Sequence, residues 1–166
     1  MMALIRDGQL AEDSFTVVTD DAELPSEGGI VVSLERWNAD RETLIDRKGP
    51  LGIRLRSDQS PELIAGDLNR FALVQLEFPQ FRDGRAYSYA RILRERYGFA
   101  DEIRAVGEVL MEQLHYMQRS GFNAFELEAD DPIAQYATAM ADFSVWYQPA
   151  AGGRQTATDL RHRDRS

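Results

Sequence analysis

The residues of this sequence best suited to binding chemistry lie in one short segment around an aspartate–glycine turn. The segment holds three arginines, two hydroxyl groups and the turn pair, namely Arg82, Asp83, Gly84, Arg85, Tyr87, Ser88 and Arg91. Guanidinium groups bind planar anions through paired hydrogen bonds, and a helix that follows directly adds oriented N–H donors. The segment is therefore a candidate anion-binding or partner-binding site. A solvated loop, followed by a helix on which Arg91 pairs with Glu95, explains the same residues.

Glu108 is the candidate for an acid–base carboxylate, because it directly follows an apolar stretch that ends at Gly107. A carboxylate there also favours the positive end of a helix that starts next, so both interpretations stay open. The two histidines, His115 and His162, are too few for a histidine metal centre. The sequence has no cysteine, which excludes thiolate zinc sites and cysteine-bound clusters. No metal site is predicted; a flavin is compatible with the arginine-rich loop, but no sequence feature identifies a cofactor.

Charge and motif content exclude several function classes. The chain has 166 residues and a net charge of −9, which disfavours binding to nucleic acid. The span 78–98 is locally positive, with five arginines against two acids. The glycine-rich dinucleotide motif, the P-loop and the serine-hydrolase elbow are all missing from the sequence. No apolar run reaches the length of a membrane span and no signal peptide is apparent, so a cytoplasmic protein without membrane contact is expected.

Strand-like and helix-like segments alternate along most of the chain. The expected strands are 29–34, 51–55, 71–78, 103–107 and 122–127, and the expected helices are 38–48, 57–69, 87–97, 109–119 and 131–147. Ser60 and Pro61 are typical of a helix start, whereas Gly98 and Gly121 are typical of helix ends. Two apolar stretches near the N-terminus, 4–5 and 15–18, indicate a short hairpin or an edge strand with a turn at Asp7-Gly8.

This alternation predicts an α/β fold, in which repeated βα units form a mostly parallel sheet of about five strands. Five units are too few for a closed eight-fold barrel, so the sheet is expected to be open or curled into a half-barrel. Residues 1–149 are expected to form a single domain. The span 150–166 lacks apolar periodicity and is expected to be a disordered tail.

The span 78–127 resembles a family of uncharacterised bacterial proteins, a domain of unknown function. The resemblance is centred on the segment FPQFRDGRAYSYARILR and extends more weakly to GIVVSLERW. Family members are often labelled as oxidoreductases of sulfite reduction and are encoded beside the haemoprotein subunit of assimilatory sulfite reductase. This chain has Glu108, Glu112 and Asn123 where aspartates are usual in the family, and a tryptophan is common near Phe15.

The resemblance implies a role in sulfite reduction, but the chain cannot ligate an iron–sulfur cluster through cysteine. We therefore expect an accessory protein that acts as a non-catalytic partner of sulfite reductase. The alternative is a small α/β oxidoreductase or ligand-binding domain that holds an anionic substrate or a flavin at the arginine-rich loop. A homodimer that uses this surface as its interface is a further possibility.

Overall fold

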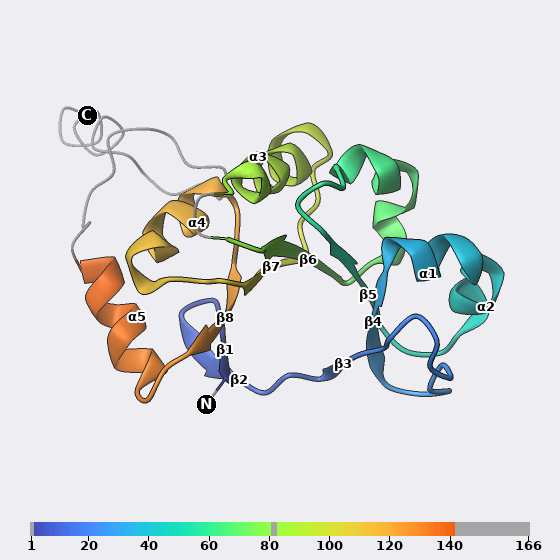
Figure 1. Cartoon of the computed structure of the whole chain (residues 1–166), viewed down its shortest axis with the longest axis horizontal. Coiled ribbons are helices and arrows are strands. Elements are labelled where there is room, and N and C mark those ends of the chain that lie inside the picture. The colour runs from blue at the N-terminus through green and yellow to red at the C-terminus, as the bar shows by residue number, and fades with distance from the viewer. Residues whose placement is uncertain (1, 81–82, 142–166) are drawn as a thin grey trace, which may run out of the picture.

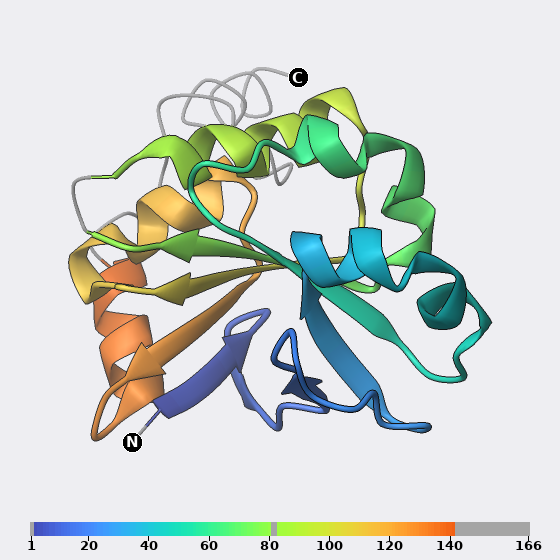
Figure 2. The ribbon, with the colours of Figure 1, turned by 45° about the vertical axis from the view of Figure 1, so that its right-hand side comes forward.

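The computed structural model describes residues 2–80 and 83–141, in which a single curled sheet carries helices on its outer side (Figure 1 and Figure 2). The strand order is β2-β1-β8-β7-β6-β5-β4-β3. Strands β3 to β8 are parallel, whereas β1 is antiparallel to β2 and to β8. The strands are β1 (Met2–Arg6), β2 (Gln9–Ala11), β3 (Phe15–Val17), β4 (Gly29–Ser33), β5 (Leu51–Leu55), β6 (Leu73–Phe78), β7 (Glu102–Gly107) and β8 (Ala124–Glu128).

The predicted α/β class and the curled, mostly parallel sheet are confirmed, but the predicted number of about five strands is wrong. The sheet has eight strands, because the N-terminal region contributes three of them. The hairpin turn lies at Asp7 and Gly8, which both have positive φ angles, of 53° and 82°. Its second strand is β2, which is short and carries little apolar character. The stretch at Phe15 instead starts the parallel part of the sheet as β3.

Short helices follow the parallel strands from β4 onward, and the last of them, α5, comes after β8. They are α1 (Leu34–Ala39), α2 (Arg41–Asp46), α3 (Arg85–Arg91), α4 (Leu114–Ser120) and α5 (Pro132–Ala141), with 3₁₀ helices at Pro61–Arg70 and Met111–Gln113 and a π-helical turn at Ile92–Arg96. The expected helix 38–48 is wrong in its start and its continuity. Ser33 Oγ accepts a hydrogen bond from the Arg36 N–H and starts α1 directly after β4, and the helix breaks at Asp40.

Other helix signals in the sequence are confirmed. Ser60 Oγ accepts a hydrogen bond from the Glu62 N–H at the start of the first 3₁₀ helix, and Pro61 is its first residue. Gly98 and Gly121 follow helix ends with φ angles of 63° and 126°. None of the helices in the described part of the chain has the length and apolar character that crossing a membrane requires. The predicted tail, 150–166, lies outside the described residues.

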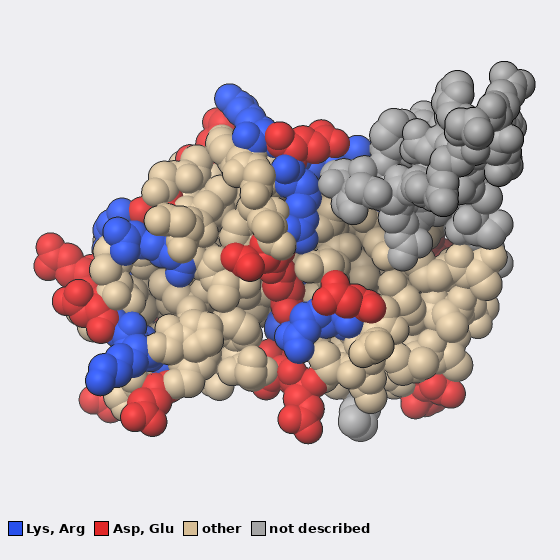
Figure 3. Space-filling view, turned by 180° about the vertical axis from the view of Figure 1, so that it is seen from behind, with Lys and Arg blue, Asp and Glu red and all other residues tan. Residues whose placement is uncertain are grey.

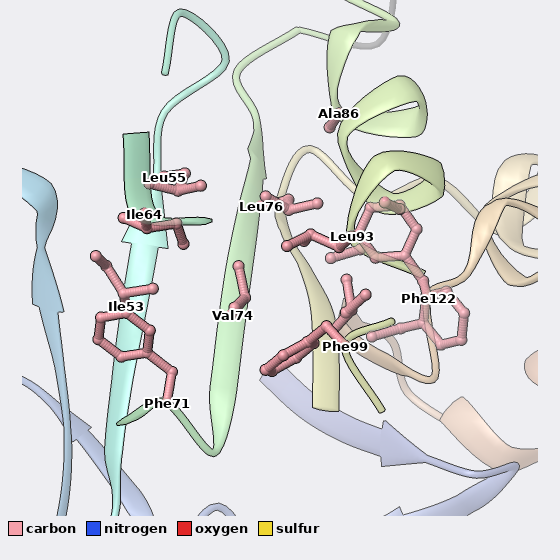
Figure 4. Close-up of a cluster of buried hydrophobic side chains, with 14 of the residues drawn as sticks. Ile53, Leu55, Ile64, Phe71, Val74, Leu76, Ala86, Leu93, Phe99 and Phe122 are labelled. Carbon is pink, nitrogen blue, oxygen red and sulfur yellow. The ribbon is translucent and has the colours of Figure 1, made fainter. Parts of the chain in front are cut away.

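The apolar core lies between the sheet and the helices, on the convex side. Alternate residues of β4 to β8 point to this side, and the helices cover them (Figure 4). The cluster in the close-up comes from β5, β6, the first 3₁₀ helix, α3, the π-helical turn after it, and the loops before β6, β7 and β8. The labelled members are Ile53, Leu55, Ile64, Phe71, Val74, Leu76, Ala86, Leu93, Phe99 and Phe122. Because one contiguous cluster joins these elements, α3 is held rigidly against the sheet.

A short connection forces the sheet to curl. A flat sheet of eight strands would be about 34 Å wide, given a spacing of about 4.8 Å between neighbours. Its two ends are nevertheless β2 and β3, and the chain passes from Ala11 to Phe15 in four steps, which reach at most about 15 Å. Residues 9–11 pair with β1 and residues 15–17 pair with β4. One extended stretch, 9–17, therefore joins both ends of the sheet.

The concave side of the sheet carries charge, in contrast to the convex side. Arg104 of β7 is 0% exposed, and its Nη1 donates hydrogen bonds to Asp13 (3.1 Å) and Glu126 (3.2 Å). Its Nε donates to Glu102 at 2.8 Å, and Nη2 lies 2.7 Å from the same carboxylate, out of line for a hydrogen bond. Burial alone would lower the pKa of Arg104, but the carboxylates, Glu102 first, raise it above its ordinary value. Arg104 therefore stays charged and ties the joining stretch to the middle of the sheet.

We predict that Arg104→Met destabilises the fold by about 3–5 kcal/mol, because it leaves Asp13 and Glu126 without their buried countercharge. Urea unfolding followed by circular dichroism measures this loss. The matched control is Arg96→Met, which removes an exposed pair with Glu62 and should leave the unfolding midpoint almost unchanged. Equal midpoints for the two variants would contradict the role given to Arg104.

Candidate functional site

Helix α3 distributes the predicted site residues over different faces. Residues four apart lie on one face of an α-helix, so Arg85 and Tyr89 share one side while Tyr87 and Arg91 share another. The buried Ala86 and Ala90 form the side that packs on the core. The structure therefore divides the predicted site into two surfaces instead of one anion cradle.

The first surface is a closed polar cluster beside the loop after β5. Arg85 Nη2 donates hydrogen bonds to Asp83 Oδ2 at 2.9 Å and to Ser57 Oγ at 3.1 Å, and Arg85 Nε donates to Asp83 Oδ1 at 3.1 Å. The Tyr89 hydroxyl donates to the Ser57 carbonyl at 2.7 Å. Arg85 holds the pKa of the Asp83 carboxyl well below its usual range, through its side chain first and its backbone N–H second. These groups anchor the start of α3 to the loop after β5.

Most of the described arginines in the locally positive span 78–98 bind partners within the molecule. Arg94 donates to the backbone carbonyls of Phe99 and Gly121, and burial lowers its pKa. Arg96 pairs with Glu62 on the surface, and Arg85 pairs with Asp83. On the face shown in Figure 3, positive and negative side chains are interspersed, as these pairings lead one to expect. The four described arginines of the segment, Arg85, Arg91, Arg94 and Arg96, therefore do not form a shared positive patch.

Arg91 differs from the other described arginines of this segment. Within the part of the chain that the structure describes, it has no ion-pair or hydrogen-bond partner. The pair with Glu95 that the sequence suggested is not formed, and the chain changes from α-helical to π-helical geometry directly after Arg91. The wider π-helical turn disrupts the alignment that an i, i+4 pair needs.

Arg91 lines the second surface, which we call the aromatic groove. It lies between α3 and the segment 111–120, has a volume of about 360 Å³, and is lined by Tyr87, Arg91, Glu112, Gln113, Tyr116 and Ser120. The rings of Tyr87 and Tyr116 meet edge to face, with centroids 6.3 Å apart. Tyr116 is 57% exposed, and the exposed Met111 lies at the start of the same segment. Exposed tyrosine, methionine and arginine are the residue types enriched in protein interfaces.

Tyr87 anchors the floor of the aromatic groove to the core. Its ring contacts the buried Phe78 edge to face, with the centroids 5.1 Å apart. Burial, and secondarily the neighbouring Tyr116, raises the pKa of Tyr87, so the phenol stays protonated and can donate a hydrogen bond at neutral pH. The groove therefore combines a fixed aromatic floor with one cation that has no described partner.

The remaining predicted site residues lie elsewhere. Glu108 is exposed on the loop after β7, and its N–H donates to the Phe78 carbonyl at 2.7 Å. The helix expected directly after it starts later, so Glu112 and not Glu108 is the acid in the first turn. Gly84 precedes α3 and Ser88 is exposed on its outer side, whereas Arg82 lies outside the described residues. Arg85, Tyr87 and Glu108 do not meet in one pocket.

The structure shows what surrounds Glu112 and Asn123, two of the positions at which this sequence differs from the family pattern described above. Glu112, where aspartate is usual in the family, lines the aromatic groove, where a longer side chain reaches further across it. Asn123 Oδ1 accepts a hydrogen bond from the Ile103 N–H at 2.8 Å, and the Asn123 N–H donates to the Ile103 carbonyl. These two hydrogen bonds link β7 to the start of β8. An aspartate oxygen could accept the same bond from Ile103, so the position requires a hydrogen-bond acceptor and does not require a charge.

The sequence interpretation missed a pocket at the mouth of the curled sheet. This mouth pocket lies at the carboxyl ends of β3 to β6 and has a volume of about 360 Å³. Its polar lining includes Asp20, Ser33, Arg54, Arg56 and Glu77. The sequence does contain an indication of this pocket, because the apolar strands β5 and β6 each carry one charged residue, Arg54 and Glu77. In the described ranges 2–80 and 83–141, no three histidine, aspartate or glutamate side chains are grouped to hold a metal ion.

We predict that Asp83 titrates at an unusually low pH and that Arg85→Gln moves its pKa up towards the ordinary aspartate value. Because the folded-state pKa is depressed, the Asp83–Arg85 interaction stabilises the fold above the unfolded pKa and is lost as the pH falls through the folded pKa. Carboxyl carbon NMR shifts measured against pH follow both proteins. An ordinary Asp83 pKa in the unmodified protein would contradict the closed polar cluster.

Comparison with known proteins identifies a family but no characterised relative. No curated protein and no solved structure matches the chain significantly. A family model matches residues 52–158, which is more than half of the chain and includes α3, α4 and both walls of the aromatic groove. The chain therefore belongs to the family described as bacterial protein of unknown function (DUF934).

Proposed function

We propose that this protein is a non-catalytic partner protein that docks through its aromatic groove, and that its partner is assimilatory sulfite reductase. The observation that carries the docking role is the state of Arg91. It is a cation without a described partner that lines the same groove as Tyr87 and Tyr116, whereas Arg85 and Asp83 of the same segment pair with each other.

The groove favours binding over catalysis for a chemical reason. A general acid or base must face a place where a substrate can sit, with its pKa matched to the reaction. Of the acids in the predicted site, Asp83 is bound to Arg85 with a depressed pKa, and Glu108 does not line the groove. Glu112 does line the groove, but its side chain is exposed to solvent. A tyrosine pair, an arginine and an exposed methionine instead offer a partner aromatic contact area and one charge to match.

The choice of sulfite reductase as partner rests on the resemblance of the segment 78–127 to proteins labelled for sulfite reduction. Sulfite reduction transfers six electrons and needs metal cofactors, some of them bound by cysteine. This chain contains no cysteine, so it has no thiolate of its own for such a cluster. A complex between the two proteins would place the redox cofactors in the reductase and the docking surface in this chain.

The alternative function, an anionic substrate or flavin held at the arginine-rich loop, has less geometric support. Two of the three guanidinium nitrogens of Arg85, Nε and Nη2, already bind Asp83 and Ser57, so a paired contact with a ligand would have to compete with at least one of these bonds. Arg91 lies on a different side of α3 from Arg85. Stabilisation of the purified protein by flavin mononucleotide in a thermal melt would favour this alternative over docking.

We predict that the protein binds the haemoprotein subunit of sulfite reductase and that Arg91→Gln weakens this binding about tenfold or more, as expected for a central interface arginine. Biolayer interferometry at low and high salt measures the dissociation constant, and higher salt should slow association because charge steers the encounter. Tyr116→Ala tests the aromatic part of the groove without disturbing the core, since its side chain is largely exposed.

The matched control is Arg70→Gln, which changes an exposed arginine outside the groove and should bind as the unmodified protein does. No association at any salt concentration would refute the choice of partner. Association that Arg91→Gln and Tyr116→Ala both leave unchanged would refute the groove as the docking surface.

A further inference from the structure

The mouth pocket has the position that ligand sites take in parallel α/β folds. Ligands in such folds bind at the carboxyl ends of the strands, where the loops converge. The mouth pocket lies at this edge, on the concave side, between the ends of β3, β4, β5 and β6. Ser33 and Arg54 are register partners on neighbouring strands, so both side chains point to the same side of the sheet.

Charges of both signs line this pocket side by side. Arg54 Nε donates to Glu77 Oε2 at 3.3 Å, and the two side chains are 34% and 27% exposed. Arg56 and Asp20 add a second charge of each sign, and the exposed Val17 supplies apolar surface. A pocket of this volume, part apolar with a few placed polar groups, suits a small organic molecule.

Arg54 keeps binding capacity for such a molecule. Among the described residues, Glu77 is its single partner, and the bond uses Nε alone. The two terminal nitrogens of Arg54 are thus available to the two oxygens of a carboxylate, in the fork geometry that guanidinium groups favour. The existing pair is long and partly solvated, so reorganising it for a ligand costs little.

We infer that the mouth pocket binds a free α-amino acid with a short aliphatic side chain. The ligand carboxylate lies on Arg54, its ammonium group lies on Glu77, and its side chain lies against the exposed Val17. Both ligand charges are needed. A simple carboxylate on Arg54 would lie next to the carboxylate of Glu77, and a simple amine on Glu77 would lie next to the guanidinium of Arg54.

This inference is independent of the docking role, because the mouth pocket and the aromatic groove share no lining residue. The walls of the mouth pocket come from β3 to β6 and the loops after them, whereas those of the groove come from α3 and the segment 111–120. A variant in one site therefore leaves the other site intact as an internal check on folding.

Isothermal titration calorimetry of the whole protein tests the inference with L-valine and two matched analogues. Isovalerate has the carboxylate without the amine, and isobutylamine has the amine without the carboxylate. L-Valine is expected to bind at one site per chain. Each analogue is expected to bind at least about tenfold more weakly than L-valine, because each lacks one of the two charged groups that hydrogen-bond to Arg54 or Glu77. L-Alanine and L-leucine extend the test to smaller and larger side chains.

Arg54→Gln and Glu77→Gln are each expected to weaken L-valine binding about tenfold or more, whereas Arg96→Gln, an exposed arginine elsewhere, should not change it. Thermal melts confirm that each variant is folded, and the analogue titrations need no variant. The inference is overturned if none of the three amino acids binds, if isovalerate or isobutylamine binds as well as L-valine, or if both pocket variants bind normally.

Discussion

The short passage from β2 to β3 is the constraint on which the rest of this structure depends. Three residues join the two ends of an eight-stranded sheet, so the sheet must curl until both ends meet the stretch 9–17. Arg104 then ties Asp13, in the middle of that stretch, to β7 and β8. Burying the charge of Arg104 costs desolvation free energy. The ion pairs nevertheless hold the stretch 9–17 in one position, because hydrogen bonds between charged groups need defined partners and directions, whereas apolar contacts do not.

The curl has two consequences for function. On the concave side it gathers the carboxyl ends of β3 to β6 into the mouth pocket. On the convex side it spreads the helices around an arc, so that α3 and α4 meet at an angle open to solvent and form the aromatic groove. The rotation of α3 about its own axis determines which of its side chains line that groove. Tyr87 and Arg91 do, whereas Arg85 turns to Asp83 and Ser57.

Much of the fold could be predicted from the sequence, because strand and helix signals alternate and end at clear glycine and proline positions. The β5 bounds 51–55 and the helix start at Ser60 and Pro61 are confirmed. The number of strands was not predictable in this way. Strand β2 has too few apolar residues to be recognised as a strand in the sequence, and it forms by pairing with β1. The site was harder still. Spacing alone indicated one arginine cluster, but the structure consumes Arg94 on backbone carbonyls and leaves Arg91 in the groove.

Hydrogen–deuterium exchange on the complex with the sulfite reductase haemoprotein tests the central claim most directly, because it maps the docking surface without altering the chain. We expect the partner to slow exchange of backbone amides in α3 and in the segment 111–120, while amides of β3 and β4 at the mouth of the curled sheet exchange as before. Slower exchange confined to the mouth, or no change anywhere at a saturating concentration of partner, would contradict it.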